Sequence, residues 1–192
     1  MTEIISTDSS SLVIHSLKDN SYIVDNSVCD IKSLLNDYPE IIVYGKKCLQ
    51  RRSIGFFSDE SLGYKYSGKI EKSQPLTKNL KLLLNYINKK FESDFNGILV
   101  NKYNNGNDYI SDHSDNEKEI SDKGVISVSY GAVRKFRIRN KLTKKIVKDI
   151  PTENYQIIEM AGNFQKEFLH GIPIEKKVKD ERISFTFRKH YE

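Results

Sequence analysis

Six short segments in the C-terminal half of the chain alternate apolar and polar residues with a period of two. They are residues 96–103, 125–131, 133–140, 145–150, 155–162 and 182–188, and turn-forming residues lie between them. This period places successive side chains on opposite faces of a strand. Short strands at such spacing are typical of sandwiches and barrels. We therefore expect an α+β protein whose core is a double-stranded β-helix, or jelly roll.

The N-terminal half has a different pattern. Residues 75–91 repeat apolar side chains at helical spacing, which predicts a helix that packs on the core. Residues 28–38 predict a shorter helix, residues 40–45 a strand, and residues 51–68 an aromatic loop. We expect residues 1–43 to form a helical extension that supports one sheet, and residues 44–192 to form the main domain.

Length and cysteine content narrow the class of protein. A chain of 192 residues suits one domain. Cys29 and Cys48 form no C-x-x-C pair, which argues against a zinc finger and for a reducing compartment. No apolar run has transmembrane length, and the first residues lack the features of a signal peptide. We expect a soluble monomer in the nucleus or cytoplasm, with no membrane partner.

The net charge of +5 is unevenly distributed. Residues 134–148 read RKFRIRNKLTKKIVK and contain no acid. Clustered positive charge on a β ribbon indicates a polyanionic partner such as nucleic acid. An ordinary lysine-rich surface has the same composition, so charge alone leaves both interpretations open. On the first interpretation, Arg137 and Arg139 contact phosphates.

The segment YISDHSDNEKEI, residues 109–120, places His113 and Asp115 two residues apart, with Glu117 next in step. In an extended segment these side chains point the same way and can converge. A solvated acidic loop is the alternative. His170, in NFQKEFLHGIP, follows a predicted strand. Two histidines and one carboxylate form the facial triad of non-haem iron enzymes.

The last predicted strand, RISFTFR, places Arg182 and Arg188 on a polar face opposite three apolar residues. Because the apolar face belongs to the core, both guanidinium groups need anionic partners. A dicarboxylic cosubstrate is one candidate, since arginine binds carboxylate through two parallel hydrogen bonds. Asn101 and Tyr103 add polar groups on one face of another strand.

In chain order, the segments NKYNNG, HSD, SYGAVRKF, LHGIP and RISFTFR resemble the motifs of the AlkB family of Fe(II)- and 2-oxoglutarate-dependent dioxygenases, most closely its eukaryotic nucleic-acid repair branch. The resemblance covers about residues 44 to 190. It implies Fe(II), 2-oxoglutarate and O₂ as cofactor and cosubstrates. The implied Fe(II) ligands, which are also the catalytic residues, are His113, Asp115 and His170. The implied contacts of 2-oxoglutarate are Asn101, Tyr103, Arg182, Ser184 and Arg188.

The resemblance also implies an activity, namely oxidative demethylation of N-alkylated bases such as 1-methyladenine and 3-methylcytosine in DNA or RNA, with release of formaldehyde. The base must leave the stack to react, and a nucleotide-recognition lid is expected around residues 49–68. The implied substrate contacts are Tyr64, Tyr66, Ser67, Glu117, Arg51 and Arg52. Two alternatives stay open: a 2-oxoglutarate-dependent hydroxylase of a protein or small molecule, and a catalytically inactive nucleic-acid-binding module.

Overall fold

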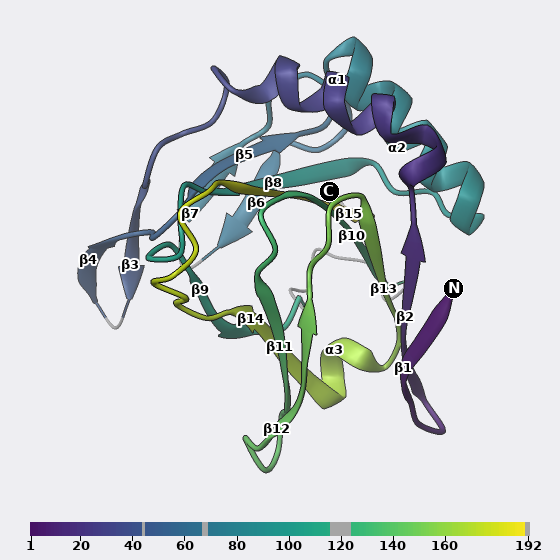
Figure 1. Ribbon diagram of the computed structural model, residues 1–192. Coiled ribbons are helices and arrows are strands. Elements are labelled where there is room, and N and C mark those ends of the chain that lie inside the picture. Colours follow the sequence, from purple (N-terminus) through teal and green to yellow (C-terminus); the bar gives the residue numbers. More distant parts are fainter. Residues whose placement is uncertain (44, 67–68, 116–123, 191–192) are drawn as a thin grey trace.

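The computed structural model of the protein describes residues 1–43, 45–66, 69–115 and 124–190 (Figure 1). Within them, two antiparallel sheets form the body of the molecule, in the strand orders β1-β2-β13-β10-β15-β8-β5 and β12-β11-β14-β9. The larger sheet contains β1 (Thr2–Ser6), β2 (Ser10–Ser16), β5 (Ser53–Phe57), β8 (Gly97–Tyr103), β10 (Val125–Gly131), β13 (Gln156–Gly162) and β15 (Arg182–Arg188). The smaller sheet contains β9 (Ile110–His113), β11 (Lys135–Asn140), β12 (Ile146–Pro151) and β14 (Phe168–Ile172).

The remaining elements are helices and two-stranded ribbons. The ribbons pair β3 (Glu40–Val43) with β4 (Lys46–Leu49), and β6 (Gly63–Tyr66) with β7 (Lys69–Lys72). The helices are η1 (Lys18–Asn20), α1 (Ser21–Ile31), α2 (Lys78–Phe91) and α3 (Phe164–Glu167). No helix in the described part of the chain is both long and apolar enough to cross a membrane.

Two apolar cores flank the larger sheet. The outer core lies beneath α1 and α2, which cover one face of the sheet (Figure 1), and it includes Leu83, Ile87 and Phe185. The inner core includes Phe136, Ile138 and Phe164 and fills part of the space between the sheets. The prediction of a jelly-roll core with N-terminal helices on one sheet is confirmed.

Helix α2 begins at a side-chain cap. Thr77 stands in extended conformation before the first turn, and its hydroxyl accepts a hydrogen bond from the Leu80 backbone N–H at 3.2 Å. That N–H has no acceptor within the helix, so the threonine replaces water there. The apolar stripe of the helix, which includes Leu80 and Leu84, is then directed onto the sheet.

We expect Thr77→Ala to lower the free energy of unfolding by about 1 kcal/mol, because the N–H loses its partner. Urea unfolding followed by circular dichroism measures the change. Thr77→Ser keeps the hydroxyl and is expected to stay close to the parent protein. Equal stability of the alanine variant and the parent would refute the role of this cap.

Three expectations about the N-terminal half were wrong. The first residues are not part of a helical extension: β1 and β2 form one edge of the larger sheet, and β2 pairs with β13. The serines of this segment obscure its alternation. The first helix runs over Ser21–Ile31, ahead of the predicted 28–38, because its buried stripe starts at Ile23. The aromatic segment 51–68 contains β5, which is buried along its whole length.

Candidate active site

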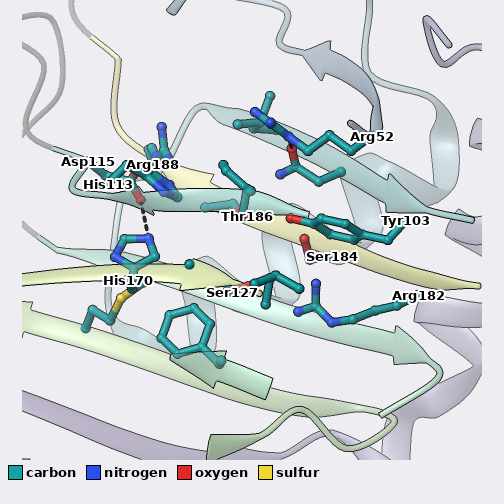
Figure 2. A pocket seen from close by; sticks show the side chains of 17 residues that line it. Arg52, Tyr103, His113, Asp115, Ser127, His170, Arg182, Ser184, Thr186 and Arg188 are labelled. Carbon is teal, nitrogen blue, oxygen red and sulfur yellow. Dashed lines mark hydrogen bonds and ion pairs between the residues drawn. The ribbon is translucent and has the colours of Figure 1, made fainter. Parts of the chain in front are cut away.

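The structure brings His113, Asp115 and His170 together (Figure 2). His113 ends β9 and pairs in register with His170 on the adjacent strand β14. Oδ1 of Asp115 lies 3.6 Å from Nε2 of His113, and Oδ2 lies 3.5 Å from Nε2 of His170. The three candidate ligand atoms lie within 4.8 Å of one another. The predicted convergence of these residues is therefore confirmed as geometry.

The hydrogen bonding of His113 directs a lone pair into this cluster. Its Nδ1 lies 2.9 Å from the carbonyl oxygen of Ser111. Because a carbonyl only accepts, Nδ1 carries the proton and Nε2 faces Asp115 unprotonated. Burial first, and then the neighbouring His170, lowers the pKa of His113 to about 3. At neutral pH the imidazole is therefore an uncharged donor, the form in which histidine binds metals.

Asp115 supplies the negative charge of the cluster. It is buried, which by itself raises its pKa, but the Arg188 guanidinium and the two histidines lower the pKa by more. Arg188 Nη2 lies 2.5 Å from Oδ1 in an ion pair that lacks hydrogen-bond geometry. The carboxylate is therefore ionised.

The donor set fits Fe(II). Two imidazoles and one ionised carboxylate lie close together, and three ligands on one side leave further positions for a cosubstrate. Nδ1 of His170 is buried without a hydrogen-bond partner in the described part of the chain. The tautomer of His170 is therefore not set by a protein partner there, and a metal on Nε2 would place the proton on Nδ1.

A pocket extends from the triad between the two sheets. Its volume is about 500 Å³, which includes the part that is open to solvent. Arg182, Ser184, Thr186 and Arg188 line it from β15 (Figure 2). The alternating apolar residues of β15 point into the outer core. The predicted division of this strand into a polar and an apolar face is confirmed.

Arg182 is a buried cation at the end of the pocket away from the triad (Figure 2). Its Nε donates to Thr152 Oγ1 and its Nη2 to Ser129 Oγ, both at 3.0 Å. Its Cζ lies 5.4 Å from the centre of the Tyr103 ring. Burial lowers its pKa to about 10, so the side chain stays charged at neutral pH. Among the described residues no acid forms an ion pair with it, so the pocket holds positive charge available to an anion.

Asn101 and Tyr103 project into the pocket from β8, as expected. Arg52 lies beside them, 5% exposed, and its Nε donates to Asn101 Oδ1 at 2.7 Å. Arg51 is exposed and lies outside the pocket, with its Cζ 6.0 Å from the Tyr38 ring. The two neighbouring arginines therefore have different surroundings, although the sequence placed them together.

Four of the expected substrate contacts have side chains outside the described part of the chain. Tyr64 and Tyr66 belong to β6, but their side chains lie outside the described part of the chain, as do Ser67 and Glu117. Their roles stay predictions.

The two arginines expected to contact phosphates are each paired with an acid of the protein. Arg137 donates to both oxygens of Asp149 at 2.8 Å, and Arg139 donates to Asp112 at 2.6 Å. Arg134, the first residue of the basic segment, is 1% exposed. Periodicity showed which residues share a face, but it could not show the acids opposite them.

Arg134 instead holds several segments together beneath the pocket. Its guanidinium donates to the carbonyl oxygens of Asn105, Asp108 and Pro173 and pairs with Glu175. It also lies 5.8 Å from the centre of the Tyr103 ring. The interpretation of Arg134 as part of a basic surface ribbon was therefore wrong. Its position in the motif SYGAVRKF could have indicated a buried role.

Sequence reasoning also missed Gln165, whose Oε1 accepts the backbone N–H of Asp115 at 2.9 Å. It missed the strand β14 as well, since FLHGI is short and contains a glycine. Ser129 and Thr152, the partners of Arg182, carry no sequence signal, because single hydroxyl residues are common in strands.

Comparison with known proteins gives concordant matches. The family model of the "2OG-Fe(II) oxygenase superfamily" matches residues 30–188. "DNA oxidative demethylase ALKBH2" of Homo sapiens is 30% identical over 155 residues, which cover 77% of this chain and 59% of that protein. "Alpha-ketoglutarate-dependent dioxygenase alkB homolog 3" of Bos taurus is 32% identical over 121 residues, which cover 58% of this chain and 42% of that protein.

A solved structure, "The structure of OsALKBH1", superposes with a TM-score of 0.56 over 93% of this chain and 97% of that one, at 17% identity. At this identity the likeness concerns the fold. The chain spans 59% of the length of human ALKBH2 and 56% of the bovine protein, so the matched region is only part of those relatives.

Proposed function

The chain belongs to the 2OG-Fe(II) oxygenase superfamily and, within it, to the AlkB family, and on this premise we propose that it oxidatively demethylates N-alkylated bases in DNA or RNA. One observation carries the proposal. A single pocket has a carboxylate and two imidazoles at one end and the buried cation of Arg182 at the other (Figure 2). This arrangement suits a metal beside a dicarboxylic cosubstrate.

We assign Fe(II) to His113, Asp115 and His170. When bound, Fe(II) with O₂ and 2-oxoglutarate supplies the oxidation: the cosubstrate becomes succinate and CO₂, the N-methyl group is hydroxylated, and the hemiaminal releases formaldehyde to leave N–H. The residues of the chain bind and orient the reactants. Arg188 keeps the carboxylate of Asp115 ionised.

Arg182 is assigned to the far carboxylate of 2-oxoglutarate. Its guanidinium is fixed by Thr152 and Ser129, so little side-chain entropy is lost when the anion binds. Asn101, Tyr103 and Ser184 line the same part of the pocket. The apolar walls, which include Leu99 and Phe136, exclude water from the reactants.

Nucleic acid is the proposed substrate class because the relatives include a DNA oxidative demethylase and an alkB homologue. Exposed lysines on the hairpin between β11 and β12 supply phosphate contacts that Arg137 and Arg139, being paired, do not. These are Lys144 and Lys145 in the turn and Lys148 on β12. The segment around 49–68, apart from the buried strand β5, is proposed as the nucleotide lid, with Tyr66 stacking on the extruded base and Tyr64 and Ser67 lining the pocket.

We further propose that residues 44–192 form the dioxygenase domain, with residues 1–43 completing its sheet and helical layer. The enzyme is proposed to act as a monomer in the nucleus or cytoplasm. Cys29 and Cys48 are exposed free thiols, which suits a reducing compartment.

Mass spectrometry of methylated oligonucleotides tests the proposal. Single- and double-stranded DNA and RNA carrying one 1-methyladenine or 3-methylcytosine are incubated with the protein, Fe(II) and 2-oxoglutarate. We expect at least one substrate to lose the mass of a methylene group only when both additions are present. Turnover of 2-oxoglutarate with every oligonucleotide unchanged would favour a protein or small-molecule hydroxylase. Oligonucleotide binding without any turnover would favour an inactive module.

A further inference from the structure

The two ligands His113 and Asp115 lie on a weakly paired part of the sheet. Strand β9 is an edge strand, and its register with β14 consists of His113 with His170 and Ile110 with Ile172, with an irregularity between them. Asp115 lies beyond the end of β9. Backbone pairing therefore does little to fix the carboxylate, and other contacts must position it.

Those contacts come from the basic strand β11 and the residue after it. Arg139 Nε donates to Asp112 Oδ2 at 2.6 Å, and Lys141 Nζ donates to Ser114 Oγ at 2.9 Å. Asp112 and Ser114 alternate with the two ligands along the chain. The arginine and the lysine therefore hold the outward-facing residues on either side of His113.

Strand β14 separates β11 from β9 in the sheet, so the side chain of Arg139 must cross it to reach Asp112. Gly171 leaves the space for this contact. A Cβ at that position would lie 3.0 Å from Asp112 Oδ1 and 2.9 Å from the carbonyl oxygen of Ile110, closer than ordinary packing allows. The absence of a side chain at residue 171 is therefore matched to the position of Asp112.

A second set of contacts holds the same segment from the side of α3. Lys141 Nζ also donates to the carbonyl oxygen of Gln165 at 3.2 Å. The backbone N–H of Lys141 donates to the carbonyl oxygen of Glu167. Gln165 in turn accepts the N–H of Asp115. Three side chains thus hold this segment: Arg139 contacts Asp112, Lys141 contacts Ser114, and Gln165 contacts the backbone of Asp115.

We propose that Arg139 and Lys141 are positioning residues of the metal centre rather than phosphate contacts. They hold the segment from Asp112 to Asp115 so that His113 and Asp115 face His170. The inference rests on the proposed assignment of Fe(II) to these ligands. It also explains why Arg139 is paired with an acid although it belongs to a basic ribbon.

A double-mutant cycle on metal affinity tests the inference. Arg139→Gln, Asp112→Asn and the double variant are titrated with Co(II), as a redox-stable stand-in for Fe(II), by isothermal titration calorimetry. Loss of a group that hydrogen-bonds directly to a metal ligand typically costs about 10–100-fold in metal affinity. The pair of Arg139 and Asp112 acts one residue away from the ligand His113, so its effect should be smaller. We therefore expect each single variant to bind Co(II) about threefold to tenfold more weakly, and the double variant to bind no more weakly than either single one.

The chain offers a matched control on the same strand. Arg137 and Asp149 form a bidentate pair of the same chemistry, but this pair joins β11 to β12 rather than to the ligand-bearing strand β9. Arg137→Gln is expected to leave Co(II) affinity unchanged. Arg139→Lys, which keeps a charge able to reach Asp112, is expected to restore part of the lost affinity. The visible absorption bands of the Co(II) protein should shift in Arg139→Gln and not in Arg137→Gln.

Two outcomes would overturn the inference while leaving the proposed function intact. One is unchanged Co(II) affinity in Arg139→Gln together with a salt slope of oligonucleotide binding reduced by about 0.7–0.9, as expected for a lost phosphate contact. The other is lower stability of the metal-free variant towards urea with unchanged Co(II) affinity and spectrum, which indicates a role in the fold alone. Failure of the parent protein to bind Co(II) would instead contradict the proposed function itself.

Discussion

Asp115→Asn is expected to lower the rate of base demethylation at least about a hundredfold, because the metal contributes several kcal/mol to such reactions. The amide keeps the shape of the side chain but removes the charge that two histidines and Arg188 surround. Metal affinity and turnover should therefore fall together. Demethylation is measured by mass spectrometry of a methylated oligonucleotide, and Co(II) affinity by calorimetry.

Nucleic-acid binding provides the control for this variant, since phosphate contacts on the surface are remote from the carboxylate. Oligonucleotide affinity should stay within about threefold of that of the parent protein. Because the buried guanidinium of Arg188 loses its ion pair with Asp115, circular dichroism must first show that the variant is folded. A folded Asp115→Asn protein with parental turnover would rule out this carboxylate as a metal ligand.

Arg182→Lys is expected to raise the Michaelis constant for 2-oxoglutarate about tenfold to a hundredfold, since each hydrogen bond to a charged group is worth about 1.5–3 kcal/mol. Lysine keeps the positive charge but loses the planar pair of donors that fits a carboxylate. It also loses the contacts with Thr152 and Ser129 that fix the guanidinium. Initial rates at varied 2-oxoglutarate measure the effect.

The internal control is the Michaelis constant for the methylated oligonucleotide, which should change much less, because Arg182 is buried at the end of the pocket away from the triad. Rates at saturating 2-oxoglutarate should recover most of the parental value. A parental Michaelis constant for 2-oxoglutarate in Arg182→Lys would show that the cosubstrate is anchored elsewhere.

The parts of the site that lie on regular strands could be predicted from the sequence. The alternation of RISFTFR separated Arg182 and Arg188 from the apolar core residues, and the two-residue spacing of His113 and Asp115 predicted their convergence. Both inferences need only the local geometry of an extended chain. His170 came from chemistry, since a facial triad requires a third ligand.

The contacts that depend on the third dimension could not be predicted. Arg139 belongs to a basic segment in sequence, but the acid that neutralises it lies on β9, beyond an intervening strand. Arg134 belongs to the same segment and is buried against carbonyl groups of two loops. Likewise, the N-terminal strands β1 and β2 are stabilised by pairing with β13, which local propensity does not reveal.

The stoichiometry of the reaction tests the central claim most directly, because the claim joins metal, cosubstrate and methylated base in one pocket. Succinate, formaldehyde and repaired base are quantified together after incubation of the protein with Fe(II), 2-oxoglutarate, O₂ and a methylated oligonucleotide. The three products should form in equal amounts, and omission of the oligonucleotide should sharply reduce succinate. Succinate formed at the same rate with and without methylated oligonucleotide, and with no formaldehyde, would contradict the claim.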